Sequence, residues 1–220
     1  MRTTSIIMAG LVATTVFTSC SKNFIKGEGR TLTESRDLAE FNAIEANGSV
    51  EVEIVSSNEN RVEITGYQNL IPVYETDVRN GKLVLEYDDD YINVKNDNLK
   101  VKVYSTGVNH IDLNGSGDIN AGSDIGTSMS AEVNGSGKIR FATNYFTSFK
   151  PRINGSGEIE AKDATSEEVR AEISGSGDID VRVTRYLRAY ISGSGIIDYW
   201  GNPSDGVDTE ISGSGKVRKN

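Results

Sequence analysis

The sequence predicts an all-β protein built as a parallel β-solenoid with coils of about 20 residues. One phrase returns six times in the second half of the chain: an aliphatic residue, Asn or Ser, Gly-Ser-Gly, any residue, and a second aliphatic residue. The copies begin at Leu113, Val133, Ile153, Ile173, Ile191 and Ile211, with spacings of 20, 20, 20, 18 and 20. A unit of this length cannot bury its apolar side alone, so successive units must stack on one another.

Apolar and polar residues alternate on both sides of the glycines, which predicts strands with one side in the core and one in water. The apolar positions before the phrase form a column of Met129, Phe149, Val169, Leu187 and Val207. Polar columns lie between the apolar ones: Ser130, Lys150, Arg170, Arg188 and Asp208, and then Glu132, Arg152, Glu172, Tyr190 and Glu210. An antiparallel meander of ten-residue strands would repeat at the same interval, but it gives no reason for like residues to recur in columns.

The glycines of the phrase predict a sharp corner between two strands of each coil. A corner of this kind excludes a Cβ atom, either because the atom would clash or because φ must be positive. Twelve glycines occupy these positions: Gly115, Gly117, Gly135, Gly137, Gly155, Gly157, Gly175, Gly177, Gly193, Gly195, Gly213 and Gly215. The serine between each pair should point outward. The second turn of each coil is less regular and absorbs the two-residue deletion of the 18-residue copy.

Residues 35–110 show strand chemistry without a clean period. Val50 to Ile54 alternate with glutamates, and Val78 to Leu83 carry an Asn-Gly dipeptide that suits a type I′ hairpin turn. The segment Ala46-Asn47-Gly48-Ser49-Val50 resembles a decayed copy of the repeat. We expect residues 35–110 to form an N-terminal β region that is continuous with the regular solenoid of residues 111–220 and caps it.

The N-terminus predicts export and lipidation. Arg2 precedes an apolar run from Ile6 to Phe17, which is typical of a secretory signal over residues 1–19 and is short for a membrane span. Phe17-Thr18-Ser19-Cys20 resembles a bacterial lipobox, so Cys20 is the expected lipidation site, followed by a tether over residues 20–34. The alternative is ordinary cleavage that leaves a free thiol. A lipid anchor predicts a cell-envelope location, at the outer membrane, on its surface or periplasmic side.

Charge and cysteine content exclude several classes of function. With Arg2 removed, 22 basic residues face 32 acidic ones, a net charge of −10. An acidic chain without a basic cluster in its sequence argues against nucleic-acid binding. Cys20 is the only cysteine, so no disulfide, thiolate metal site or cysteine nucleophile remains once it is lipidated. We expect no cofactor and no metal.

Four motifs that bear on chemistry have simpler explanations. Gly-Ser-Gly-Asp-Ile-Asp at 175–180 is superficially similar to a calcium-binding nonapeptide roll, but the period is 20 and the acidic position holds Arg140 and Arg218 in two of the coils. Asp88-Asp89-Asp90 with Asp97 suits a solvated acidic turn. Glycoside cleavage needs two carboxylates at a defined separation, and the acids here alternate with Lys and Arg along outward columns. His110, the only histidine, is expected at the surface.

Three aromatic residues are candidate ligand contacts. Tyr190 occupies an outward column, while Tyr199 and Trp200 precede the turn at Gly201-Asn202-Pro203. A solvent-facing aromatic ring beside acidic residues can stack on a sugar ring, and packing in the core or a turn is the alternative for each.

A lipoprotein signal, Gly27-Glu28-Gly29, Phe41 with Ile44, and the Gly-Ser-Gly-x-Ile corners together resemble the autotransporter adhesin family with the head GIN domain, common among lipoproteins of Bacteroidetes. The resemblance covers roughly residues 35–217. It implies a pectin-lyase-like, right-handed β-helix without the catalytic residues of the enzymes, and a role in adhesion.

Two functions remain open. The first is a non-enzymatic envelope lipoprotein that presents its solenoid faces to a glycan or protein partner. The second is a polysaccharide-active β-helix enzyme, a lyase or hydrolase. Because Lys216, Arg218 and Lys219 would discourage stacking at the C-terminal end, a monomer is favoured over a trimer.

Overall fold

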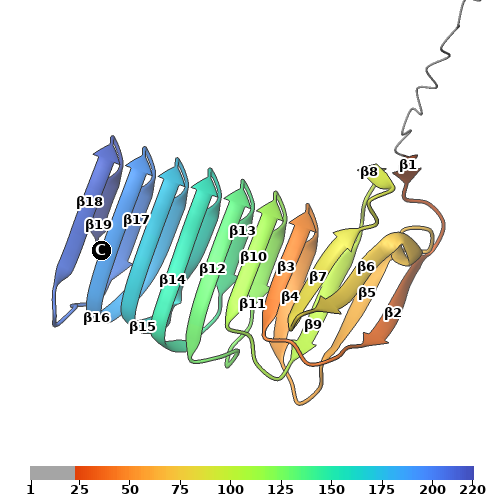
Figure 1. The fold of residues 1–220 in the computed structure, drawn as a ribbon, viewed down its shortest axis with the longest axis horizontal. Coiled ribbons are helices and arrows are strands. Elements are labelled where there is room, and N and C mark those ends of the chain that lie inside the picture. Colours follow the sequence, from red (N-terminus) through yellow and green to blue (C-terminus); the bar gives the residue numbers. More distant parts are fainter. Residues whose placement is uncertain (1–22) are drawn as a thin grey trace, which may run out of the picture.

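The computed structural model describes residues 23–220 and shows an all-β chain (Figure 1). These residues form nineteen strands and one short 3₁₀ turn, Ile71–Val73. The expected signal segment and Cys20 lie outside the described residues. Within residues 23–220, no helix has the length and hydrophobicity needed to cross a bilayer.

Each coil has two strands joined by the glycine corner. In one coil, β12 (Ser128–Gly135) leads to the corner and β13 (Lys138–Phe141) leaves it. We call the side of the solenoid formed by strands before the corner the leading face, and the side formed by strands after it the trailing face. The remaining strands of the regular coils are β10 (His110–Gly115), β11 (Asp118–Ala121), β14 (Tyr145–Gly155), β15 (Glu158–Gly175), β16 (Asp178–Gly193), β17 (Ile196–Trp200), β18 (Val207–Gly213) and β19 (Lys216–Lys219). β15 and β16 each begin on the trailing face after one corner and continue through the second turn to the leading face before the next corner.

The coils stack in parallel and in register, which confirms the predicted solenoid and excludes the antiparallel meander for this part of the chain. Val133 lies opposite Leu113 in the preceding coil and Ile153 in the next. The corners belong to the same ladder, since the Ser136 amide donates to the Gly115 carbonyl at 3.0 Å and the Lys138 amide to the Gly117 carbonyl at 3.0 Å. Like residues therefore lie side by side along the whole stack.

The apolar columns fill the interior between the two faces. Leu113, Val133 and Ile153 are fully buried, as are Phe146 and Phe149, whose rings stack 5.3 Å apart. Burying a side chain of this size contributes roughly 1.5–3 kcal/mol each, so a column that repeats in every coil supplies stability in proportion to the number of coils.

The first half of the chain adds one further coil and then a cap. β3 (Ala43–Gly48) and β4 (Glu51–Ser56) form the coil, and Asn47 and Gly48 lie opposite Asn114 and Gly115, which confirms the decayed copy. β7 (Lys82–Tyr87) and β9 (Lys100–Ser105) extend the two faces in parallel by one strand each.

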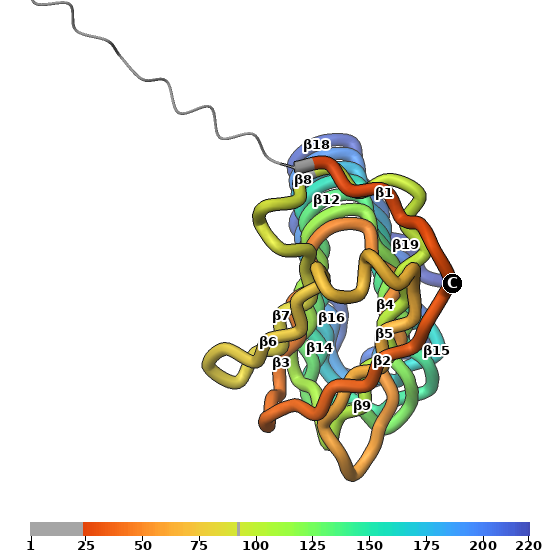
Figure 2. The backbone as a smooth tube through the Cα atoms, turned by 90° about the vertical axis from the view of Figure 1, so that its right-hand side faces the viewer, coloured from red at the N-terminus to blue at the C-terminus, as the bar shows by residue number. Residues whose placement is uncertain are grey.

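The stack then closes with antiparallel strands. β6 (Tyr74–Arg79) pairs with β7, while β5 (Arg61–Tyr67) pairs with β9 and β2 (Thr31–Asp37) with β5 (Figure 2). The predicted hairpin joins β6 to β7, with positive φ at Asn80 and Gly81. β1 (Asn23–Lys26) and β8 (Tyr91–Lys95) form a separate two-stranded sheet beside this cap.

Candidate ligand-binding face

The corner glycines keep the coils close and the faces regular. At Gly155, φ is +135° and an added Cβ would lie 2.3 Å from the Gly135 carbonyl oxygen. The second glycine of the same corner, Gly157, has no positive φ, but its Cβ would lie 2.5 Å from Cγ1 of Val133. Both glycines are thus required by the approach of the preceding coil, and the first also by its backbone conformation. The serines between the glycines are exposed.

Tyr190 lines a hollow on the leading face. It lies on β16 between Glu172 of β15 and Glu210 of β18. The hollow has a volume of about 400 Å³, and Arg170 and Arg188 also line it. We call it the Tyr190 hollow. Its walls combine an aromatic ring, two guanidinium groups and two carboxylates, a mixture able to contact both the apolar and the polar sides of a ligand.

Three successive coils place a basic residue at the same outward position of the leading face. Lys150, Arg170 and Arg188 are exposed members of one column, and Arg170 lies directly opposite Arg188. Neighbouring strands are about 4.8 Å apart, and like charges placed directly opposite repel. Within residues 23–220, Lys150 and Arg170 have no ion pair, and Arg188 reaches Asp208 only at 4.0 Å. We call these three residues the basic column.

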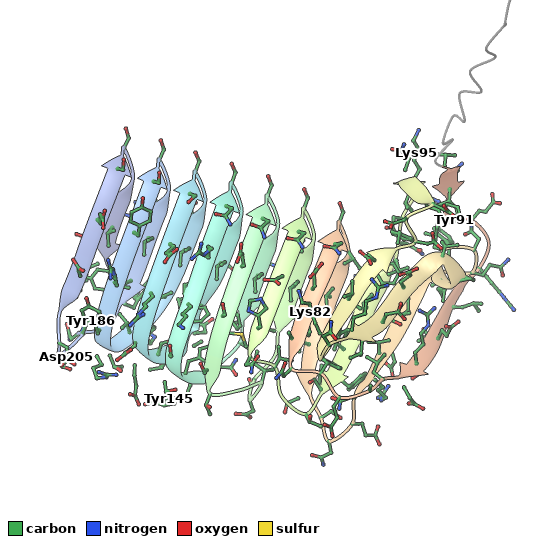
Figure 3. The ribbon with its side chains drawn as sticks, viewed as in Figure 1. Lys82, Tyr91, Lys95, Tyr145, Tyr186 and Asp205 are labelled. Atoms are coloured by element: carbon green, nitrogen blue, oxygen red, sulfur yellow. The ribbon has the colours of Figure 1, made fainter. Side chains whose placement is uncertain are left out.

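A second, smaller hollow continues the first along the basic column. It has a volume of about 190 Å³ and is lined by Lys150 and Arg152, and it shares Arg170 and Glu172 with the Tyr190 hollow. Glu172 forms an ion pair with Arg152 at 2.7 Å, so its carboxylate does not neutralise the neighbouring charges of the basic column. Figure 3 shows the side chains of this face, with Tyr145 and Tyr186 near the second turns.

The structure does not bring Tyr199 and Trp200 to Tyr190. Both belong to β17 on the trailing face, opposite Val181 and Arg182 of the preceding coil. Tyr199 packs against the hydrophobic core, and both side chains are partly buried. The basic column was not predicted, because alternating acidic and basic residues along outward columns are typical of a solvated face. The signal that would reveal it is the succession of Lys, Arg and Arg in one outward column.

The trailing face carries a hollow of about 490 Å³. It opens where Gly122 and Ala142 follow the strands, between Val55 on one side and Lys162 on the other. Arg140 crosses it and binds Glu160 at 3.1 Å. Glu53, which also lines it, binds Lys102 at 3.2 Å.

The trailing face also carries two facing carboxylates with different environments. Asp180 lies opposite Asp198 in the next coil. Burial, followed by the charge of Asp198, raises the pKa of the Asp180 carboxyl, whereas hydrogen bonds from Arg218 lower the pKa of Asp198. Neither residue lines one of the hollows described above. His110, predicted at the surface, is partly exposed and contacts Asp112 at 2.8 Å. In the described part of the chain, no group of three or more His, Cys, Asp or Glu residues is placed to hold a metal ion.

These features define a β-solenoid protein with polar, regular faces and a ligand-sized hollow bordered by cations. The model of the family described as putative auto-transporter adhesin, head GIN domain, matches residues 40–203, and the chain belongs to this family. The adhesin description points to a protein of the cell surface or envelope.

Solved structures share the fold. A putative adhesin from Bacteroides fragilis is 22% identical with a TM-score of 0.69, and the match covers 89% of this chain and 100% of that one. A putative adhesin from Parabacteroides distasonis is 20% identical with a TM-score of 0.57, covering 90% and 100%. A putative lipid binding protein from the same organism is 23% identical with a TM-score of 0.56, covering 90% and 100%. None of these names describes an enzyme. A comparison with curated proteins gives no match.

Proposed function

We propose that the chain is a non-enzymatic, lipid-anchored protein of the cell envelope that binds an acidic glycan through its leading face. In this proposal residues 1–19 are a signal peptide, Cys20 carries the lipid, and residues 20–34 form a tether. Residues 35–110 then cap the regular solenoid of residues 111–220, and the location is the outer membrane.

The observation that carries the proposal is the Tyr190 hollow beside the basic column. An aromatic ring offers a flat apolar surface to the C–H face of a sugar, as Tyr and Trp do at many interfaces. Arginine binds carboxylate, sulfate or phosphate groups through two parallel hydrogen bonds. Because Lys150, Arg170 and Arg188 recur at about 4.8 Å, they suit a linear polymer that bears an anionic group on successive sugars.

The test is binding of polygalacturonate to the purified chain, with neutral dextran as the comparison polymer. Tyr190→Ala should weaken polygalacturonate binding about three- to tenfold, and the double change Arg170→Ala with Arg188→Ala about tenfold or more. Binding should weaken with added salt, since the contacts are ionic. Tyr145→Ala is the matched control, because Tyr145 is 53% exposed and lies outside both leading-face hollows. Equal binding by the wild type and both hollow variants would refute the site.

Lipidation and location are tested separately. Cys20→Ser should move the protein from the membrane fraction to the soluble fraction of cells, and an unchanged distribution would argue against the anchor. Protease treatment of intact and lysed cells, followed with an antibody against the solenoid, distinguishes the two sides of the membrane. Cleavage on intact cells supports adhesion at the surface, and protection until lysis rules it out.

One observation favours the alternative of a polysaccharide-active enzyme. Asp180 and Asp198 are facing carboxylates whose pKa values are shifted in opposite directions, which is the arrangement that separates an acid from a base in glycosidases. The measurement is release of reducing ends from polygalacturonate by the wild type, Asp180→Asn and Asp198→Asn. Turnover that both substitutions abolish would replace the binding proposal with an enzymatic one.

A further inference from the structure

The last coil of the solenoid is uncovered. Val207 and Ile211 of β18 are 38% and 44% exposed, while Leu187 and Ile191, their counterparts one coil earlier, are completely buried. Every residue of β18 is exposed. These apolar side chains have the same inward direction as the core columns, and they lack only the next coil that would cover them.

The strand edges of this coil are also unpaired in the described chain. β18 pairs only with β16, and β19 only with β17, among the strand pairings of residues 23–220. The opposite end of the stack is closed by the antiparallel strands β2, β5 and β6. An open edge with apolar residues beneath it is a template for pairing with another chain. Within residues 23–220, one end of the stack is therefore capped and the coil of β18 and β19 is open.

The two strands of the open coil carry opposite charges on their outward sides. β18 presents Asp208 and Glu210, and β19 presents Lys216 and Arg218. The basic residues of β19, taken alone, favour a monomer. With the acids of β18 included, the end surface is half negative and half positive, so it is complementary to a copy of itself turned over.

We propose that the open coil binds the open coil of a second copy of this chain, in a two-fold dimer whose axis runs parallel to the strands. This axis places β18 of each copy antiparallel to β19 of the other, so acidic and basic strands meet twice. It also brings Ile211 close to Val217 of the second copy and buries both. The other end-to-end two-fold would pair β18 with β18 and β19 with β19, and like charges would face each other.

Glu210 and Lys216 are the charges most available for this contact. Arg218 already binds Asp198 through two nitrogens, at 2.7 and 2.5 Å, and Arg188 lies 4.0 Å from Asp208. Among the ion pairs of residues 23–220, neither Glu210 nor Lys216 takes part in one. Diagonal neighbours on paired strands lie about 7–8 Å apart, within reach of long side chains, so Glu210 of one copy can meet Lys216 of the other.

If the chain carries the proposed lipid anchor, the dimer also fixes how two anchored copies are arranged. This step alone rests on the proposed function. β1 lies at the capped end and the open coil at the opposite end (Figure 1). A dimer through the open coils therefore places the two β1 strands at its two far ends. Two anchored copies on separate membranes would be held facing each other.

The experiment measures the mass of the chain carrying Cys20→Ser by sedimentation equilibrium over a range of concentrations. The wild-type surface should give a reversible dimer. Glu210→Lys and Lys216→Glu should each weaken dimerisation about tenfold or more, since each places like charges at both contacts. An equimolar mixture of the two variants should restore the dimer, because the reversed charges then complement each other at one contact and the original charges at the other.

Two further variants separate this interface from any other. Ile211→Lys should abolish the dimer, whereas Leu32→Lys, at a residue 38% exposed on the capped end, should leave it intact. Circular dichroism checks that each variant is folded. A wild type that stays monomeric at every concentration overturns the proposal, and so does a dimer that survives Ile211→Lys. Because Glu210 also lines the Tyr190 hollow, glycan binding is tested with the Tyr190, Arg170 and Arg188 variants and not with the dimer variants.

Discussion

Asn134 donates a hydrogen bond from its side-chain amide to the side-chain carbonyl of Asn114, 3.0 Å away in the preceding coil. Asn114 donates in the same way to Asn47 at 2.9 Å, and Asn154 to Asn134 at 2.8 Å. An asparagine has both a donor and an acceptor in a fixed geometry, so in-register stacking lets each satisfy its neighbours. The ladder stops at Ser174, where serine replaces asparagine in the column.

Asn134→Ala should lower the free energy of unfolding by about 1–2 kcal/mol. The change leaves the half-buried Asn114 carbonyl without its donor, while the Asn154 amide keeps Glu132 at 2.9 Å. Urea denaturation compares the free energies of unfolding of the variant and the wild type. Ser192→Ala, at the same column three coils on, is the control and should change stability by less than about 0.5 kcal/mol. Equal losses for the two variants would mean that the ladder adds nothing beyond side-chain burial.

The corner glycines offer a way to separate backbone conformation from steric contact. Gly48 has φ of +98° and no atom within 4 Å of an added Cβ, so Gly48→Ala should cost about 1–2 kcal/mol. Gly157→Ala meets the Val133 side chain without a positive φ, and Gly155→Ala combines both problems. We expect the cost to be largest for Gly155→Ala, on the order of 4 kcal/mol or a failure to fold.

Gly107→Ala is the control for this series. An added Cβ there meets no atom within 4 Å and φ is not positive, so the change should be neutral or stabilising by less than about 1 kcal/mol. Melting temperatures measured by circular dichroism give the order. If Gly48→Ala proved as costly as Gly155→Ala, backbone conformation alone would explain the first glycine of each corner.

The regular half of the fold could be predicted from the sequence because in-register stacking repeats the residue type of each position from one coil to the next. The apolar residue at Val133 recurs at Ile153, and the deletion falls in the second turn, so columns can be read without knowing the structure. The cap could not be predicted in the same way. Val62 and Ile64 predict a strand, but no local feature of the sequence predicts that β5 runs antiparallel to both β9 and β2. That pairing depends on which strand edges the end of the stack leaves uncovered.

The candidate site was partly predictable. Period-2 alternation placed Tyr190 outward, and the structure agrees. The same alternation, counted from the buried Ile197, places Tyr199 on the inward side, and its ring packs against the core opposite Val181. Recognising the basic column requires counting charges down a column of the stack, because along the chain Arg170 stands among Glu167, Glu168 and Glu172.

Asp180 and Asp198 should have opposite effects on stability at neutral pH. The pKa of Asp180 is raised above its ordinary value of 3.8, so its ionisation is disfavoured in the folded state and stability falls as pH rises through the folded pKa. The pKa of Asp198 is lowered, so its contribution is present above the unfolded pKa and is lost as pH falls through the folded one. Asp180→Asn should therefore raise the melting temperature at pH 7, and Asp198→Asn should lower it.

Both differences should shrink toward pH 3.8, where an unfolded aspartate is half protonated. Melting temperatures at pH 7 and near pH 4 give the two comparisons. A stabilisation by Asp180→Asn that stayed the same at both pH values would assign its effect to packing rather than to charge.

Tyr74 is buried in the cap with its hydroxyl unsatisfied. The side chain is 1% exposed, its ring meets the ring of Tyr87 edge-on at 5.0 Å, and its oxygen has no hydrogen-bond partner. Burial raises the pKa of the hydroxyl, because the phenolate would be left without water. A buried polar group without a partner costs about 1–3 kcal/mol, so Tyr74→Phe should keep the ring contact and stabilise the cap by about 1 kcal/mol.

Tyr104→Phe is the matched control for this change. The Tyr104 hydroxyl donates to Glu63 at 3.1 Å, and the Arg61 guanidinium lies 3.7 Å from its ring centre. Phenylalanine keeps the cation–π contact but loses the hydrogen bond, so stability should fall by about 0.5–1.5 kcal/mol. Urea unfolding should show a rise in the free energy of unfolding for Tyr74→Phe and a fall for Tyr104→Phe if the Tyr74 hydroxyl is unpaired in solution. A loss of stability in Tyr74→Phe would instead show that this hydroxyl has a partner, a bound water or a shifted Asp97, and that the cap uses it.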